Sequence, residues 1–277
     1  MSLDNLIICE RTRTDLNNYL QHPTQTLLLT GLPGSGLCSI AVALAKRLAG
    51  SDILVLKPTQ HDKQKTEIIN TDDVAQLEGL VRDKRQSRFV VVMDDIDKTA
   101  PGLFEHMLKL VEEPVQNLHY IFTTHNLPRI PQTILSRTAT IRVGLPASDE
   151  CKALYANLPA KQAKQISFAI GRQPSLIVKL LSDSEAMTDR LSRIGLAKDF
   201  LQAKGGRRIE LIDGINDRQT AIDFVNDVSM LYLAVAENSG TLTARFSQGA
   251  RLMSDIADCL ANNGNTKIQL TNLALNL

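Results

Sequence analysis

The first half of the sequence alternates short apolar runs with helical patterns, and this alternation limits the fold more than any other feature. Runs typical of strands lie at residues 26–30, 52–58, 88–95, 119–126 and 139–146. Stretches with helical spacing lie between them, at residues 39–50, 71–85 and 101–114. Strands that alternate with helices are typical of a parallel sheet whose strands are joined by right-handed crossovers. The sequence therefore predicts an α/β domain over residues 1–146.

The pattern changes after Pro146, where the strand signals end. Residues 147–183 indicate short helices, and residues 184–277 show helical periodicity with no strand signal. A chain of 277 residues has room for two or three domains. We therefore expect a small helical domain over 147–183 and an all-helical C-terminal domain over 184–277.

Composition excludes several classes of protein. No apolar run approaches the roughly 18 residues that a membrane span needs, and the polar start resembles no signal peptide, so we expect a cytoplasmic protein without membrane contact. The formal charge of +1 leaves only local patches for nucleic-acid contact. The four cysteines are far apart in sequence and indicate reduced thiols, not disulfides or a zinc site: Cys9, Cys38, Cys151 and Cys259.

The stretch GLPGSGLCS at residues 31–39 has the outline of a phosphate-binding P-loop, G-x-x-x-x-G-K-[ST]. Gly31 and Gly36 occupy the glycine positions between a strand and a helix. Leu37 stands where the motif has lysine, and Cys38 stands where it has Ser or Thr. Leucine supplies no charge to a phosphate, and a thiol is a poor ligand for hard Mg²⁺. The sequence therefore predicts a degenerate P-loop that binds ATP and magnesium weakly or not at all.

Polar residues follow two further strands. Asp94 and Asp95 lie at the end of the apolar run VVVM, where a Walker B carboxylate would hold magnesium, and Thr124 lies at the end of the next strand. A pair of acids in a turn after a core strand is the alternative interpretation. Arg137 follows in ILSR, and an exposed arginine is usually a solvated surface group.

The order and spacing of these segments resemble those of the AAA+ clamp-loader ATPases. The similar segments are the P-loop, DDIDKT at 94–99, HMLKLVEEP at 106–114, TTHN at 123–126, LSRT at 135–138, GRQP at 171–174 and NNGNTKIQLTNLALNL at 262–277. In this resemblance Asp94 and Asp95 are Walker B-like, Thr124 is like sensor 1, and Arg172 lies in a region like sensor 2. Thr138 replaces the cysteine of the family's S-R-C motif. The family's zinc module is absent, because only Gly50 and Ser51 separate the P-loop helix from the next strand.

The loss of the P-loop lysine and hydroxyl makes the chain similar to the non-hydrolysing, delta-prime kind of DNA polymerase III clamp-loader subunit. That resemblance implies a hetero-oligomeric ring with gamma/tau and delta types of subunit, and contact with the sliding clamp and primer-template DNA through the complex. It also implies that Arg137 acts in trans, as an arginine finger in a neighbour's nucleotide site. No cofactor and no metal are expected.

Two alternatives stay open at this point. The chain could be an active ATPase of gamma type that uses Lys46 or Lys57 in place of Leu37, or a pure scaffold in which Arg137 is structural. A stand-alone DNA-binding protein is disfavoured, because aromatic residues make up 4% of the chain and no basic stripe occurs.

Overall fold

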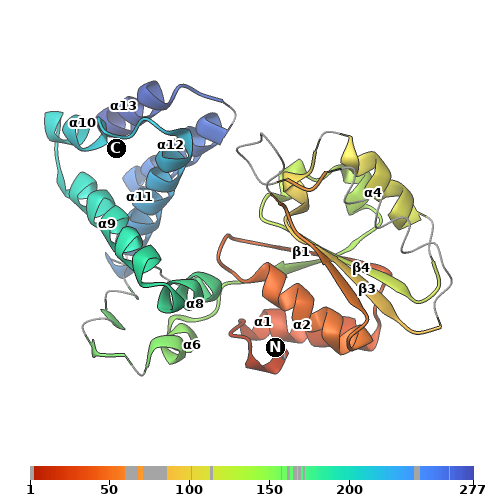
Figure 1. Ribbon diagram of the computed structural model, residues 1–277. Coiled ribbons are helices and arrows are strands. Elements are labelled where there is room, and N and C mark those ends of the chain that lie inside the picture. The colour runs from red at the N-terminus through yellow and green to blue at the C-terminus, as the bar shows by residue number, and fades with distance from the viewer. Residues whose placement is uncertain are drawn as a thin grey trace. The chain divides into compact units, whose positions relative to one another are not determined.

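The computed structural model describes residues 3–59, 68–70, 86–100, 102–112, 115–156, 158–160, 163–164, 167, 170, 172–239, 244–261 and 263–277. The helix predicted over 71–85 lies outside these residues. The chain divides into two compact units, one of Met1–Ala163 with Arg172–Val178 and one of Lys164–Gly171 with Lys179–Leu277 (Figure 1). The division into three domains at 146 and 183 stays a prediction.

The N-terminal unit contains the predicted parallel sheet. Its strands are β1 (Thr26–Gly31), β2 (Ile53–Leu56), β3 (Phe89–Met93), β4 (Leu118–Thr124) and β5 (Ala139–Val143). They lie in the order β2-β3-β4-β1-β5, and each neighbouring pair is parallel. The α/β prediction is confirmed. The carboxyl ends of the strands therefore meet at one edge, which is where ligands bind in open α/β sheets.

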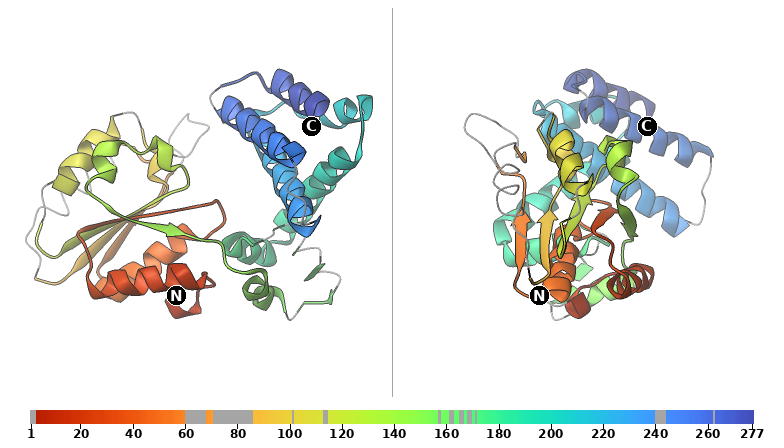
Figure 2. Two further views of the ribbon diagram at one scale, coloured as in Figure 1. Left: turned by 180° about the vertical axis from the view of Figure 1, so that it is seen from behind. Right: turned by 90° about the vertical axis from the view of Figure 1, so that its right-hand side faces the viewer.

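Helices cover both faces of this sheet (Figures 1 and 2). The described residues of this unit form the α helices α1 (Glu10–Gln21), α2 (Leu37–Ala49), α4 (Leu103–Glu112), α5 (Gln132–Leu135) and α6 (Ser148–Lys152). A further helix, at residues 174–182, begins in this unit and continues into the other. Short 3-10 helices lie at Leu3–Asn5, Ile96–Lys98, Leu127–Arg129 and Ala153–Tyr155. Side chains of α1 and α2 form the core on one face, and those of α4 and α5 form it on the other.

Strand β3 shows why this arrangement follows from the sequence. Its run of valines alternates between the two cores: Val90 and Val92 pack on the α2 side, and Val91 and Met93 pack on the α4 side. All four are fully buried. A strand that is buried on both faces needs a continuous apolar run, and the sequence provides one.

The C-terminal unit is helical, as predicted. Its helices, including the one that begins in the N-terminal unit, are α8 (Pro174–Ser182), α9 (Ser184–Gln202), α10 (Gly206–Ile212), α11 (Arg218–Ser239), α12 (Ala244–Ala261) and α13 (Thr266–Asn276). Asp183 caps α9 by accepting hydrogen bonds from the backbone N–H groups of Glu185 and Ala186, both at 3.0 Å. Phe200 of α9 packs edge-on against Phe224 of α11, with ring centroids 5.3 Å apart. Among the residues described, no helix is long and apolar enough to cross a bilayer.

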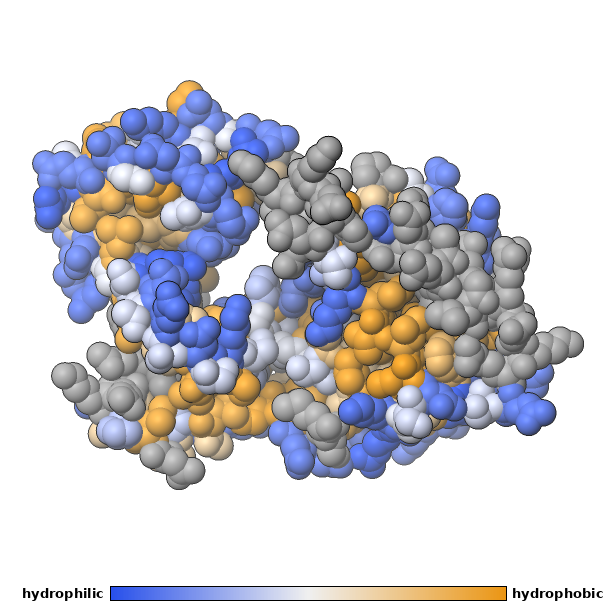
Figure 3. Space-filling model, in the orientation of Figure 1, coloured by the Kyte–Doolittle hydropathy of each residue, from blue (hydrophilic) through white to orange (hydrophobic). Residues whose placement is uncertain are grey.

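Helix α11 buries only part of its apolar surface within this unit. Phe224, Val225, Val228 and Leu231 are buried, whereas Leu233 and Val235 are 46% and 57% exposed. Figure 3 shows apolar residues among hydrophilic ones on the surface of the C-terminal unit. Leu233 and Val235 are therefore apolar side chains of α11 that stay accessible on the surface of this unit.

Candidate functional site

The loop between β1 and α2 has the backbone shape that its glycines allow. Gly34 and Gly36 have φ values of 82° and 87°, in the left-handed region that favours glycine. Gly36 is the N-cap of α2, so the helix begins at Leu37, directly after the loop. The loop thus joins strand to helix as a P-loop does.

Leu37 does not line the outer surface of this loop. Its side chain is 1% exposed and belongs to the core cluster formed with α1, α2 and the sheet. A methyl group built on Gly31 would lie 3.3 Å from Leu37 Cδ2, so the leucine packs beneath the start of the loop. The residue that replaces the P-loop lysine therefore stabilises the fold and presents hydrocarbon to the interior.

Cys38 lies beside Asp94, as the matching residues do in a P-loop site. Burial, and after it the nearby Asp94 carboxylate, raise the pKa of the Cys38 thiol, the Lys57 ammonium opposes both, and the result is a pKa of about 11. The group is therefore a neutral thiol at physiological pH, and a neutral thiol is a poor magnesium ligand. Together with the apolar Leu37, this donor set does not match the needs of a magnesium-bound triphosphate.

The raised pKa predicts slow alkylation of Cys38. A thiol with a pKa near 11 has roughly one part in 10³ as thiolate at pH 8, and that fraction rises about tenfold per pH unit until the pKa is reached. We expect iodoacetamide labelling of Cys38, followed by mass spectrometry of the folded protein, to keep rising between pH 8 and 10. The exposed Cys259 is the internal control for reagent activity. Rapid labelling of Cys38 that has already reached its plateau at pH 8 would contradict this environment.

The acidic residues after β3 are held by threonines of β4. Thr123 Oγ1 donates to Asp94 Oδ1 at 2.7 Å and accepts from the backbone N–H of Asp95 at 2.9 Å. Thr124 Oγ1 donates to Asp97 Oδ1 at 2.6 Å. The structure therefore brings together the predicted Asp94 and Asp95 at one edge of the sheet. It pairs Thr124, the residue expected at the sensor position, with a third carboxylate.

His125 connects the end of β4 to the loop after β1. Its Nδ1 donates to the carbonyl oxygen of Gly31 at 2.8 Å, and its Nε2 lies 3.6 Å from Asp95 Oδ1. Lys98 Nζ donates to Asp95 Oδ2 at 2.7 Å. His125 was not among the predicted site residues, although it directly follows the polar end of β4. The carboxylate of Asp95 is therefore paired with side chains of the same protein.

The start of α8 contacts the same loop. The backbone N–H and the Oγ of Ser175 both donate to the carbonyl oxygen of Gly34, at 3.2 and 2.9 Å. A methyl group built on Gly34 would lie 2.8 Å from Gln173 Cβ, so the two segments are in close contact. Arg172 is exposed, and its charge lies close enough to Cys151 to lower that thiol's pKa against the larger raising effect of burial. The predicted sensor 2-like segment thus meets the loop through Gln173 and Ser175.

Arg137 lies just after α5 and away from these contacts. Its NH1 donates to the carbonyl oxygen of Thr133 at 3.0 Å and to Ser136 Oγ at 3.3 Å. Its NH2 lies 2.8 Å from Glu112 Oε1, and the two side chains are 42% and 41% exposed. The guanidinium is therefore a surface group that is held at one end by an ion pair.

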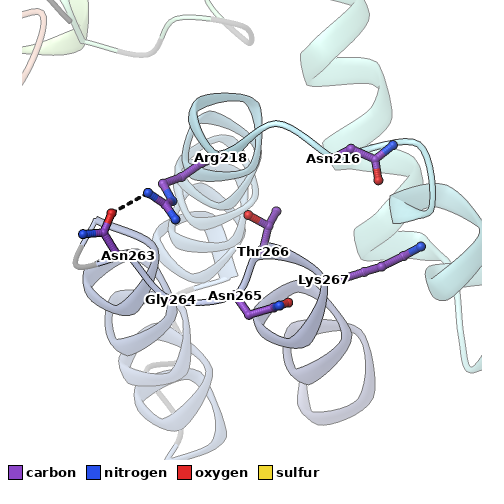
Figure 4. A pocket seen from close by; sticks show the side chains of 7 residues that line it. All are labelled: Asn216, Arg218, Asn263, Gly264, Asn265, Thr266 and Lys267. Carbon is purple, nitrogen blue, oxygen red and sulfur yellow. Dashed lines mark hydrogen bonds between the residues drawn. The ribbon is translucent and has the colours of Figure 1, made fainter. Parts of the chain in front are cut away.

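Residues 263–267 of the C-terminal motif help to line a separate polar pocket of about 450 Å³ in the C-terminal unit (Figure 4). Its lining residues are Asn216, Arg218, Asn263, Gly264, Asn265, Thr266 and Lys267. Arg218 donates to Asn263 Oδ1, and Asn265 caps α13 by accepting from the N–H of Ile268 at 3.1 Å. Asn263 and Asn265 therefore help to hold the turn between α12 and α13. In the described part of the chain, no group of three His, Cys, Asp or Glu residues is arranged to hold a metal ion.

Comparisons of sequence relate the chain to subunits of one replication enzyme. Residues 45–146 match a family described as "DNA polymerase III, delta subunit". The chain is 29% identical over 142 residues to the DNA polymerase III subunit gamma/tau of Mycobacterium bovis, a match that covers 49% of this chain and 23% of that protein. It is also 29% identical over 110 residues to the subunit gamma of Buchnera aphidicola, covering 38% of this chain and 29% of that one. The matches therefore span about a quarter of the length of these relatives.

Comparisons of structure extend the likeness over nearly the whole chain. A "DNA polymerase III, gamma subunit-related protein" of Thermotoga maritima superposes with a TM-score of 0.57 at 17% identity, over 96% of this chain and 97% of that one. RuvB of the same organism, described as a Holliday junction branch migration motor, gives a TM-score of 0.53 at 16% identity, over 98% and 89%. At these identities the likeness establishes the AAA+ type of fold. Sequence and fold together thus make the chain similar to AAA+ proteins, among them subunits of DNA polymerase III.

Proposed function

We propose that the chain is a non-hydrolysing clamp-loader subunit of the delta-prime kind, which completes a neighbour's ATPase site with Arg137. One contrast carries the proposal. The chain's own loop has a buried leucine and a neutral thiol where a P-loop has its lysine and hydroxyl, whereas a guanidinium lies exposed elsewhere on the same unit. A subunit with these properties would contribute to catalysis only in an assembly.

The chemistry of the loop supports the first half of this proposal. A P-loop lysine interacts with the β- and γ-phosphates, and the adjacent hydroxyl ligates magnesium. Leu37 and Cys38 can do neither. The Gly34 carbonyl oxygen is used by Ser175, and the Gly31 carbonyl oxygen by His125, so the loop serves contacts within the chain. The frame of a nucleotide site is thereby kept as an element of the fold.

The chemistry of arginine supports the second half. A guanidinium stays protonated and can meet two phosphate oxygens at once, so arginine is suited to stabilising charge on a transferring phosphoryl group. Partners that fit this role are the gamma/tau and delta types of subunit in a hetero-oligomeric ring. The sliding clamp and primer-template DNA would be contacted through that ring. The exposed apolar residues of α11 provide a surface for association.

Isothermal titration calorimetry of the isolated chain with ATP and magnesium tests the first half. We expect no binding in the micromolar range, because the loop lacks both the charge and the metal ligand. Copurified nucleotide, or a micromolar dissociation constant, would contradict the proposal. A clamp-loader subunit with an intact P-loop serves as the positive control for the titration.

A second candidate is an active ATPase that uses Lys57, and one observation favours it. Lys57 directly follows β2 and lies close enough to Cys38 to lower that thiol's pKa. Its ammonium could therefore supply charge near the loop. If the chain does bind ATP, Lys57→Ala should abolish the binding under this alternative, and Lys109→Ala, which removes an exposed lysine of α4, is the matched control.

A further inference from the structure

Glu112, which forms an ion pair with Arg137, lies at a position where a carboxylate does not stabilise its own helix, α4. Glu112 is the last residue of α4, and a carboxylate at the C-terminal end of a helix faces the negative end of the helix dipole. Its position is therefore unfavourable for α4 itself. The guanidinium of Arg137, 2.8 Å away, offsets that cost.

The backbone that carries Glu112 is firmly anchored. Met107, Leu110 and Val111 of α4 are buried in the core on that face of the sheet, together with Ile134 of α5. Glu112 and Arg137 thus project from two elements that share one core. The backbone at Glu112 is therefore held in place relative to the backbone that carries Arg137.

We propose that Glu112 is a positioning residue for Arg137, an inference that rests on the function proposed above. A guanidinium has five N–H donors. Among the described residues, Arg137 directs NH1 to Thr133 and Ser136 and one side of NH2 to Glu112. These contacts use at most three donors and leave others for phosphate oxygens. Glu112 therefore favours one position of the guanidinium and still lets it bind an anion.

The size of the effect follows from the exposure of the pair. An ion pair between side chains that are both about two-fifths exposed contributes a factor of about 1.5 to 5 to an equilibrium. The loss on removing Glu112 should therefore be far smaller than the loss on removing Arg137. Removing Glu112 should lower the rate of ATP hydrolysis by the neighbouring subunit and leave assembly of the complex unchanged.

A double-mutant cycle in the reconstituted, full-length clamp-loader complex tests this role. The variants are Glu112→Ala, Arg137→Ala and the double substitution, assayed by DNA- and clamp-stimulated ATP hydrolysis. We expect Glu112→Ala to lower kcat about 2- to 5-fold when Arg137 is present and to have no effect when it is absent. Glu112→Gln, which keeps an acceptor oxygen, should lose less. Glu105→Ala, an exposed acid on the same helix, is the matched control and should leave the rate unchanged.

The outcomes separate this inference from the proposed function. An equal loss on Glu112→Ala in both backgrounds would show a structural role, and no loss or a gain with Arg137 present would overturn positioning; either result leaves a role for Arg137 intact. If Arg137→Ala itself has no effect on hydrolysis, the proposed function fails and the positioning role fails with it.

Discussion

Replacing Asp227 with alanine is expected to lower the free energy of unfolding of the C-terminal unit by about 3–5 kcal/mol. Asp227 is 3% exposed on α11, and its carboxylate pairs with the guanidinium groups of Arg190 and Arg193 on α9. Arg190 is itself 9% exposed. Removing the carboxylate takes the Asp227 counter-charge from the buried Arg190 in a region of low dielectric constant, which costs far more than a lost surface contact. Arg193 is more exposed and keeps its pair with Asp223.

Urea denaturation followed by far-ultraviolet circular dichroism measures this effect. Asp223→Ala is the matched control, because Asp223 lies one turn earlier on the same helix and pairs with Arg193 at 3.2 Å, but is 34% exposed. The control should cost less than about 1 kcal/mol. If the C-terminal unit mediates assembly, Asp227→Ala should also weaken association with partner subunits. Similar small losses in both variants would contradict a buried, paired Asp227.

The fold of the N-terminal unit was predictable because the residues that are apolar in the strand sequences are also the residues that are buried in the sheet. The valine run of β3 is apolar at every position, and both of its faces are covered. The glycines of the loop after β1 marked the left-handed turns that bring the chain into α2. These signals lie within a few residues of each other, so a single sequence is enough to detect them.

The contacts of the candidate site were less predictable, because they join distant segments. His125 bonds to Gly31 across 94 positions, and Ser175 bonds to Gly34 across 141. The sequence identified the end of β4 as polar, but it could not tell that Thr124 would face Asp97 and that His125 would face the loop. The burial of Leu37 was likewise hidden, since a residue at a helix start can point inward or outward. The partner of Arg137 at Glu112 depends on how α4 and α5 share their core.

Substitution of Arg137 is expected to have a larger effect on ATP hydrolysis than substitution of Glu112. Alanine there should lower hydrolysis at the neighbouring nucleotide site by about 10³-fold, the lower range for an arginine supplied in trans. Folding should be unaffected, because an ion pair exposed to this degree contributes less than about 1 kcal/mol. Lysine should rescue poorly, since it keeps the charge but cannot form two parallel bonds to phosphate oxygens. The exposed Arg129, on the 3-10 helix before α5, is a suitable control for the loss of one surface arginine.

The most direct measurement is single-turnover ATP hydrolysis by a reconstituted complex in which only the subunit facing Arg137 has a working P-loop. We expect hydrolysis at that site to fall about 10³-fold with Arg137→Ala and to stay near the original rate with Arg129→Ala, while all subunits still copurify. Hydrolysis that is unchanged by Arg137→Ala in the intact complex would contradict the account and leave the chain a scaffold.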